Sequence, residues 1–149
     1  MMEQTRNRFD LQRFVIAQEP AYATALAELK AGDKRSHWMW FIFPQAAGLG
    51  HSATAQRYAI GSMDEARAYL AHPLLGTRLR ECTEAVLSVT GKSAHDIFGS
   101  PDDLKFRSAM TLFSEADRGG APYEEALNRY YRGEQDKDSL KIMYALKQA

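Results

Sequence analysis

The side chains with the clearest potential for chemistry lie together in the segment SHWMWFIFPQ, residues 36–45. It contains an imidazole (His37), two indoles (Trp38 and Trp40) and an amide (Gln45). Such side chains can line a pocket for a flat ligand, because indoles stack on rings and amides form directed hydrogen bonds. The alternative is a buried core helix whose His and Trp nitrogens bond to backbone carbonyls. Both roles suit a segment without charges, since an unpaired buried charge is costly.

A glycine-containing turn, GLGHS at 48–52, follows this segment directly. Its backbone N–H groups and the start of the next helix, capped by a serine, would favour a phosphate or a carboxylate. An ordinary loop is the alternative, because no strand precedes the turn and no third glycine completes a nucleotide-binding motif. The predicted ligand-binding residues of the two segments are Trp38, Trp40, Gln45, Gly48, Gly50 and Ser52.

Two neighbouring acids, Asp102 and Asp103, offer carboxylates that could act as an acid and a base or bind a hard metal ion. Together with His37, Asp103 gives a candidate catalytic pair, in which Asp103 activates water and His37 steadies the leaving group. The alternative is structural: acids in a first helical turn stabilise its positive end, and Ser100 has the spacing of an N-cap.

Metal and thiol chemistry have little support in the sequence. The four histidines, at 37, 51, 72 and 95, never recur at helical spacing, and no H-E-x-x-H motif or cysteine cluster occurs. We therefore predict no metal site and no cofactor. The single cysteine, Cys82, lies on an apolar stripe between Leu79 and Val86, and we expect an inert core thiol there.

Helical patterns must position these residues, because no segment shows sustained strand alternation. Asp10, Ser36, Ser62, Ser93 and Ser100 are candidate N-caps, Ser62 forming a capping box with Glu65, and Pro20 suits a first helical position. Gly32, Gly91 and Gly133 are candidate C-terminal stops. We expect helices after Asp10 and near 20–31, 38–43, 53–60, 63–71, 75–90, 93–96, 101–113, 123–132 and from 138. The prediction is one compact all-α domain over 1–149, with about seven or eight short helices and a frayed start at 1–9.

Composition restricts the partners. The chain has 149 residues with 19 Lys+Arg and 19 Asp+Glu, a balance that argues against nucleic acid or an anionic membrane as a partner. No charged residue occurs from Ser36 to Gln56. The apolar run at 38–43 is too short to span a bilayer. A single cysteine and a charged N-terminus without a signal-peptide pattern lead us to expect a cytoplasmic protein.

Several segments resemble a known bacterial family. SHWMWFIFPQ (36–45), GLG (48–50), HP-x-LG (72–76), IFG-x-PDD-x-K (97–105) and MTLF (110–113) are similar, in the same order, to the domain of unknown function 1810, which is sometimes labelled "calpastatin" automatically. The resemblance runs from about Phe14 to Leu140. It implies an all-helical fold similar to stacked helical repeats, and it implies no reaction, cofactor or catalytic residue.

Two functional hypotheses follow. The first is a binding or interaction module whose groove, walled by residues 36–52, holds an unknown protein or small-molecule ligand, with no nucleic-acid or membrane partner. The second is a small hydrolase that acts on a phosphate-bearing or nucleotide-like metabolite by general acid–base catalysis, with His37 and Asp103 as its catalytic groups.

Overall fold

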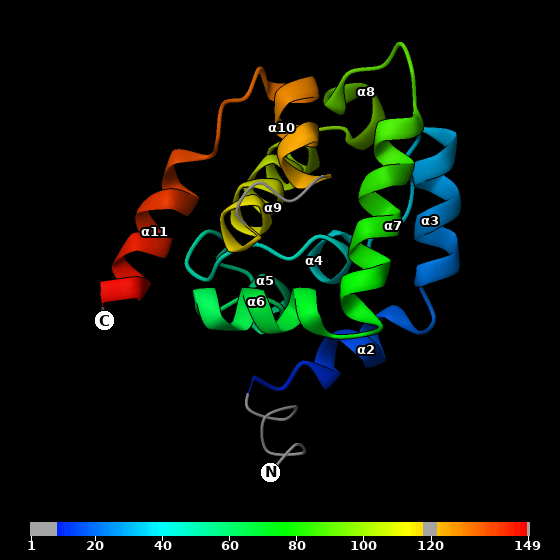
Figure 1. Cartoon of the computed structure of the whole chain (residues 1–149). Coiled ribbons are helices and arrows are strands. Elements are labelled where there is room, and N and C mark those ends of the chain that lie inside the picture. The colour runs from blue at the N-terminus through cyan, green and yellow to red at the C-terminus, as the bar shows by residue number, and fades with distance from the viewer. Residues whose placement is uncertain (1–8, 118–121, 149) are drawn as a thin grey trace.

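Ten α-helices and no strand occur in residues 9–117 and 122–148, which this computed structural model describes (Figure 1). The helices are α2 (Gln12–Gln18), α3 (Tyr22–Ala31), α4 (Met39–Ile42), α5 (Ala53–Arg57), α6 (Met63–Ala71), α7 (Leu75–Ser88), α8 (Ala94–Phe98), α9 (Asp102–Ala116), α10 (Tyr123–Tyr131) and α11 (Lys137–Gln148). The all-α prediction is confirmed. The predicted total of seven or eight was too low, because each of the ten segments with a helical pattern contains a helix, including α4, α5 and α8 with only four or five residues each. The predicted fraying of residues 1–9 lies almost wholly outside the described residues.

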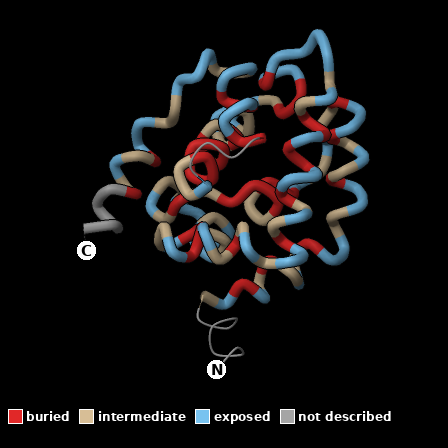
Figure 2. Tube along the Cα trace, in the orientation of Figure 1, coloured by how far each residue is buried: buried red, intermediate tan, exposed pale blue. Residues whose placement is uncertain are grey.

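The buried residues gather in the middle of the molecule, on α9, on α4 and on the chain that follows α4 (Figure 2). Helix α9 is the central element: all its residues from Ser108 to Ser114 are buried. It packs against α6, α8, α10 and α11, while α3 lies along α7 (Figure 1). The uncharged segment therefore packs on one side of the core around α9, and the tyrosines of α10 pack on another side.

Some of the predicted helix ends are confirmed by hydrogen bonds. Gly32 ends α3 in the left-handed conformation, with φ 68°. Ser62 Oγ accepts a hydrogen bond from Glu65 N at the start of α6. Ser93 and Asp96 form a reciprocal capping box at α8, each side chain accepting from the other's backbone N–H. Local side-chain chemistry was sufficient to predict these ends.

Other predicted helix starts were wrong. The residue before α2 is Leu11, and Asp10, the predicted cap, has φ 50°. Helix α3 begins at Tyr22, two residues after Pro20. Helix α9 begins at Asp102, and Ser100, joined to Pro101 by a cis peptide bond, does not cap it.

Two further capping predictions were wrong because the side chain bonds to a residue outside the predicted capping motif. The carboxylate of Glu65 accepts from Gly61 N at 2.8 Å and from Arg13, so the box predicted with Ser62 is only half formed. The hydroxyl of Ser36 donates to Glu28 at 2.6 Å, and α4 begins at Met39 rather than after Ser36. Partners outside the predicted capping motifs have replaced the expected ones, and of these only Arg13 is distant in sequence.

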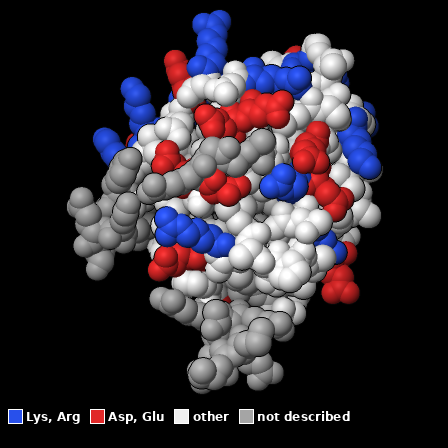
Figure 3. All heavy atoms as spheres, in the orientation of Figure 1, with Lys and Arg blue, Asp and Glu red and all other residues white. Residues whose placement is uncertain are grey.

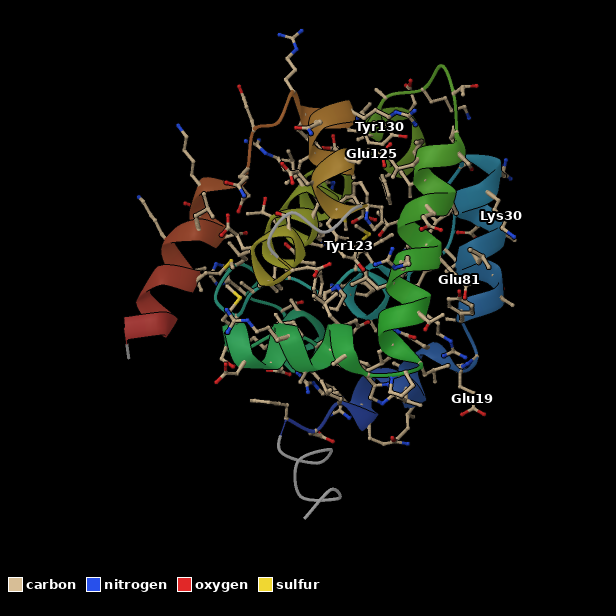
Figure 4. The ribbon with its side chains drawn as sticks, in the orientation of Figure 1. Glu19, Lys30, Glu81, Tyr123, Glu125 and Tyr130 are labelled. Carbon is tan, nitrogen blue, oxygen red and sulfur yellow. The ribbon has the colours of Figure 1, made fainter. Side chains whose placement is uncertain are left out.

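The tyrosines of α10 connect it to its neighbours. Tyr123 packs against Phe113 of α9, with ring centroids 6.0 Å apart, and Tyr130 donates to the backbone oxygen of Val86 in α7 at 2.8 Å (Figure 4). On the other side of α7, Glu81 accepts a hydrogen bond from Tyr22 of α3 at 3.2 Å. Helix α7 is thereby held between α3 and α10.

The surface carries both signs of charge, and neither sign covers the face shown in Figure 3. This distribution agrees with the balanced composition. Among the described residues, no helix combines the length and the apolar character that crossing a membrane requires.

Candidate functional site

Glu28 of α3 anchors the beginning of the uncharged segment. Its carboxylate accepts hydrogen bonds from Arg35 N at 2.9 Å, Ser36 N at 3.0 Å, Ser36 Oγ at 2.6 Å and Trp38 Nε1 at 2.9 Å. Desolvation opposes ionisation of Glu28, but these hydrogen bonds outweigh it and lower its pKa to about 2. The indole of Trp38 is only 1% exposed as a result. Trp38 therefore supports the segment from the core rather than facing solvent.

A charged cluster joins the same segment to the start of α9. Lys34 Nζ lies 2.8 Å from Asp102 Oδ2, donates to Ser36 O at 2.7 Å and lies 4.8 Å from the Trp38 ring centroid. On the other side of Asp102, Lys105 Nζ lies 3.5 Å from Oδ1 and 5.4 Å from the Trp40 ring centroid. Asp102 thus bridges two lysines: Lys34, which lies over the ring of Trp38, and Lys105, which lies over the ring of Trp40. The side chain of Lys34 is only 7% exposed, and its ammonium contacts Asp102, Ser36 and the Trp38 ring. Lys105 is partly exposed beside Trp40.

Sequence reasoning missed both lysines. The spacing of Asp102 and Lys105 is compatible with a helical ion pair, and that signal could have identified Lys105. Nothing local marks Lys34, because its partner lies 68 residues away in the chain. The predicted site therefore lacked its positive charge.

A small pocket brings together three of the predicted ligand-binding residues, Trp40, Gln45 and Gly50, with Tyr58 as a fourth wall. Its volume is about 10 Å³, which is room for about one water molecule. The indole N–H of Trp40, the amide of Gln45 and the hydroxyl of Tyr58 have no hydrogen-bond partner among the described residues. Three residues whose polar groups have no partner among the described residues thus line one pocket, and these groups are open to solvent.

The backbone around this pocket is fixed by a parallel bridge between Ala46 and Ile60. Ile60 N donates to Gln45 O and Ala47 N donates to Ile60 O, each at 2.8 Å. This pairing ends α5 at Arg57, three residues earlier than the predicted helix. It also holds Tyr58 against Phe41, with ring centroids 5.5 Å apart.

The two glycines of the turn have separate structural roles. Gly48 has φ 99°, a conformation that favours glycine. At Gly50 an added Cβ would lie 2.5 Å from the Cβ of Ala55, so only glycine allows this close approach. Ser52 caps α5, accepting a hydrogen bond from Ala55 N at 3.1 Å, as its position predicted. The turn is therefore required for closing the pocket, and its predicted role in binding an anion stays a prediction.

The structure does not join the two predicted catalytic groups. His37 is exposed, and no hydrogen bond or ion pair links it to Asp103 within the described chain. Asp103 Oδ2 instead lies 3.4 Å from Nδ1 of His95 in α8, and Asp103 Oδ1 accepts from Leu104 N at 2.9 Å. The catalytic roles of His37 and Asp103 stay a prediction, and His95 is the histidine that sequence reasoning missed.

The thiol of Cys82 has the surroundings of a structural residue. Burial raises the pKa of the Cys82 thiol to about 12, with the charge of Glu81 adding to the rise, and the side chain is 1% exposed. Its predicted inertness has a physical basis, because the thiolate is the reactive form. In the part of the chain that the structure describes, no three His, Cys, Asp or Glu side chains form a group that could hold a metal ion.

Comparison with known proteins shows what this chain is similar to. The family model described as "Protein of unknown function (DUF1810)" matches residues 8–143. A crystal structure of the conserved hypothetical protein Rv1873 from Mycobacterium tuberculosis is 51% identical in sequence, with a TM-score of 0.90. The match covers 93% of this chain and 99% of that one. None of the curated proteins matches the chain.

Proposed function

Because the chain belongs to the DUF1810 family of proteins of unknown function, we propose its function from the site itself: it is a binding protein whose segment 36–52 holds a small molecule with a flat, polar ring. One observation carries the proposal. The polar groups of Trp40, Gln45 and Tyr58 line one pocket, and none has a protein partner within the described residues. Among the described residues no buried side-chain nitrogen or oxygen lacks a partner, so these three groups are open to solvent, and a bound ligand would replace the water that they contact.

The chemistry of the walls defines the ligand class. Trp40 and Tyr58 offer ring surfaces, the indole donates a hydrogen bond, and the amide and phenol both donate and accept. This set suits a heteroaromatic ring with its own donors and acceptors. Lys105 lies beside the Trp40 ring, where its ammonium would favour a carboxylate or phosphate on the ligand. The proposed ligand is therefore a heteroaromatic compound with one acidic substituent.

Binding requires the pocket to open, since its present volume of about 10 Å³ accommodates only a water molecule. Trp40 and Gln45 are both half-buried and no hydrogen bond within the described residues holds either polar end, so we propose that these two side chains move to admit the ligand. Trp38 cannot move in the same way, because Glu28 holds its indole. The proposal thus assigns the moving wall to Trp40, while Trp38 lies in the core, outside the pocket, and holds the segment in place.

A thermal-shift screen tests the proposal, using adenine, nicotinate, indole-3-acetate and AMP beside benzoate and inorganic phosphate. A ligand at 100 times its Kd adds about 2.7 kcal/mol to the free energy of unfolding, which raises the Tm by several degrees. We expect a shift with heteroaromatic acids and a smaller one with phosphate alone. Tyr58→Phe and Gln45→Leu should each weaken binding about tenfold, because each removes one hydrogen bond. Tyr22→Phe, which removes a hydroxyl that bonds to Glu81 of α7 and does not line the pocket, is the matched control and should leave binding unchanged. The proposal is wrong if no ring compound stabilises the wild-type protein.

A further inference from the structure

A hollow with a volume of about 410 Å³ lies away from the proposed site. It is formed by the end of α6, the start of α7, the end of α9 and the start of α10. Its polar walls are His72, Thr77, Arg80, Asp117 and Tyr123, and its apolar walls include Leu70 and Pro73. Figure 4 shows Tyr123 beside α9, on the face of α10 that turns toward the molecule's interior.

Two opposite charges line this hollow. The side chains of Arg80 and Asp117 are exposed and border the same space, and neither side chain makes a hydrogen bond or ion pair within the described chain. The charges of Arg80 and Asp117 also shift the pKa of the Tyr123 hydroxyl. Burial is the main cause that raises the pKa of Tyr123 to about 12, Arg80 opposes the rise and Asp117 adds to it. At neutral pH the phenol is therefore a neutral hydrogen-bond donor placed within the field of a cation and an anion.

The floor of the hollow is rigid. At Gly76 an added Cβ would lie 2.1 Å from the backbone oxygen of Leu70, so α6 and α7 approach as closely as glycine permits. Thr77 Oγ1 donates to Pro73 O at 2.7 Å, which leaves its oxygen able to accept a hydrogen bond. Nδ1 of His72 accepts from Leu74 N at 3.1 Å and from Leu75 N at 3.2 Å, so the neutral ring carries its proton on Nε2.

We propose that this hollow binds a free apolar α-amino acid. Arg80 would take the carboxylate in a paired, charge-assisted contact, and Asp117 would take the ammonium group. The apolar side chain of the ligand would lie against Leu70 and Pro73, with Tyr123 donating a hydrogen bond to the carboxylate. A zwitterion fits best, because a simple anion would meet the charge of Asp117 and a simple cation the charge of Arg80.

The inference is independent of the proposed function, since the two sites share no residue. Isothermal titration calorimetry on the full chain tests it with L-leucine and two singly charged analogues, 4-methylpentanoate and isopentylamine. We expect saturable binding of L-leucine and binding at least tenfold weaker for each analogue. Arg80→Gln and Asp117→Asn should each weaken binding of L-leucine about tenfold, as the loss of one charge-assisted hydrogen bond implies. Arg67→Gln, an exposed arginine on α6, should have no effect.

Three results would overturn the inference. The first is no saturable heat with L-leucine, L-valine, L-methionine or L-phenylalanine. The second is equal affinity for L-leucine and 4-methylpentanoate, which would mean that the ammonium group is not recognised. The third is undiminished binding by both charge variants, once circular dichroism shows that they are folded.

Discussion

Glu28 accepts a hydrogen bond from the indole nitrogen of Trp38 across 2.9 Å, and this contact connects α3 to the segment that carries the proposed site. The same carboxylate also holds the backbone of Arg35 and Ser36. The turn before α4 is thereby attached to a helix that ends only a few residues earlier. Trp38 is therefore fixed, and the proposed function assigns the response to a ligand to Trp40.

Removing the charge of Glu28 should destabilise the protein in a pH-dependent way. The pKa of Glu28 is about 2 in the folded chain and near its usual 4.5 when unfolded, so its stabilisation is complete above pH 4.5 and is lost as the pH falls toward 2. We expect Glu28→Gln to lower the free energy of unfolding by about 1–3 kcal/mol at pH 7. In urea unfolding, the difference in the free energy of unfolding between wild type and Glu28→Gln should be smaller at pH 3 than at pH 7. Glu19→Gln, an exposed control, should show neither effect, and a pH-independent loss in Glu28→Gln would contradict the assignment.

Arg13 should be among the most sensitive positions outside the apolar core. Its guanidinium lies 2.8 Å from Glu65 and also donates to the backbone oxygens of Phe9, Asp10, Arg57 and Ala59. Arg13→Met leaves the buried carboxylate of Glu65 without its cation, a change that typically costs about 3–5 kcal/mol. Chemical denaturation measures it, and Arg67→Gln on the same surface of the chain should cost under about 0.5 kcal/mol. Adding Glu65→Leu to Arg13→Met should recover part of the loss; a still less stable double variant would show that the pairing is not the cause.

Cys82 should not react in the folded protein. Burial keeps its pKa near 12 and its side chain out of solvent, so the thiolate is scarce at pH 8. Titration with Ellman's reagent should find no reactive thiol under native conditions and one in 8 M urea. Rapid labelling of the native protein would mean that Cys82 is exposed.

Gly50→Ala should destabilise the pocket more than a comparable change nearby. The new Cβ would lie 2.5 Å from Ala55, and such overpacking costs about 1–3 kcal/mol. Gly61→Ala is the control, because its nearest contact, at 3.4 Å, is the end of the Glu65 side chain. Thermal unfolding compares the two, and equal Tm values would contradict the close approach.

Local sequence signals predicted the helices well and the site only in part. The caps at Ser62 and Ser93 and the glycine end of α3 depend on neighbours within a few residues, so pattern alone located them. The partners of Glu28 and Asp103 lie beyond the three or four residues of helical spacing, and the partner of Lys34 lies 68 residues away, so no helical pattern indicates them. Trp40, Gln45 and Gly50 belong to the uncharged run from which the site was predicted, while Tyr58 lies beside them only because of the bridge at Ile60; their role in binding stays a prediction.

The most direct test of the proposed site is tryptophan fluorescence during titration with the best heteroaromatic acid from the thermal-shift screen. Only Trp40 lines the pocket, because Trp38 is buried and bonded to Glu28. We predict a saturable change in the emission of the wild-type protein and its loss in a folded Trp40→Phe variant. An emission change that persists in Trp40→Phe, at the same Kd, would place the ligand elsewhere and contradict the account.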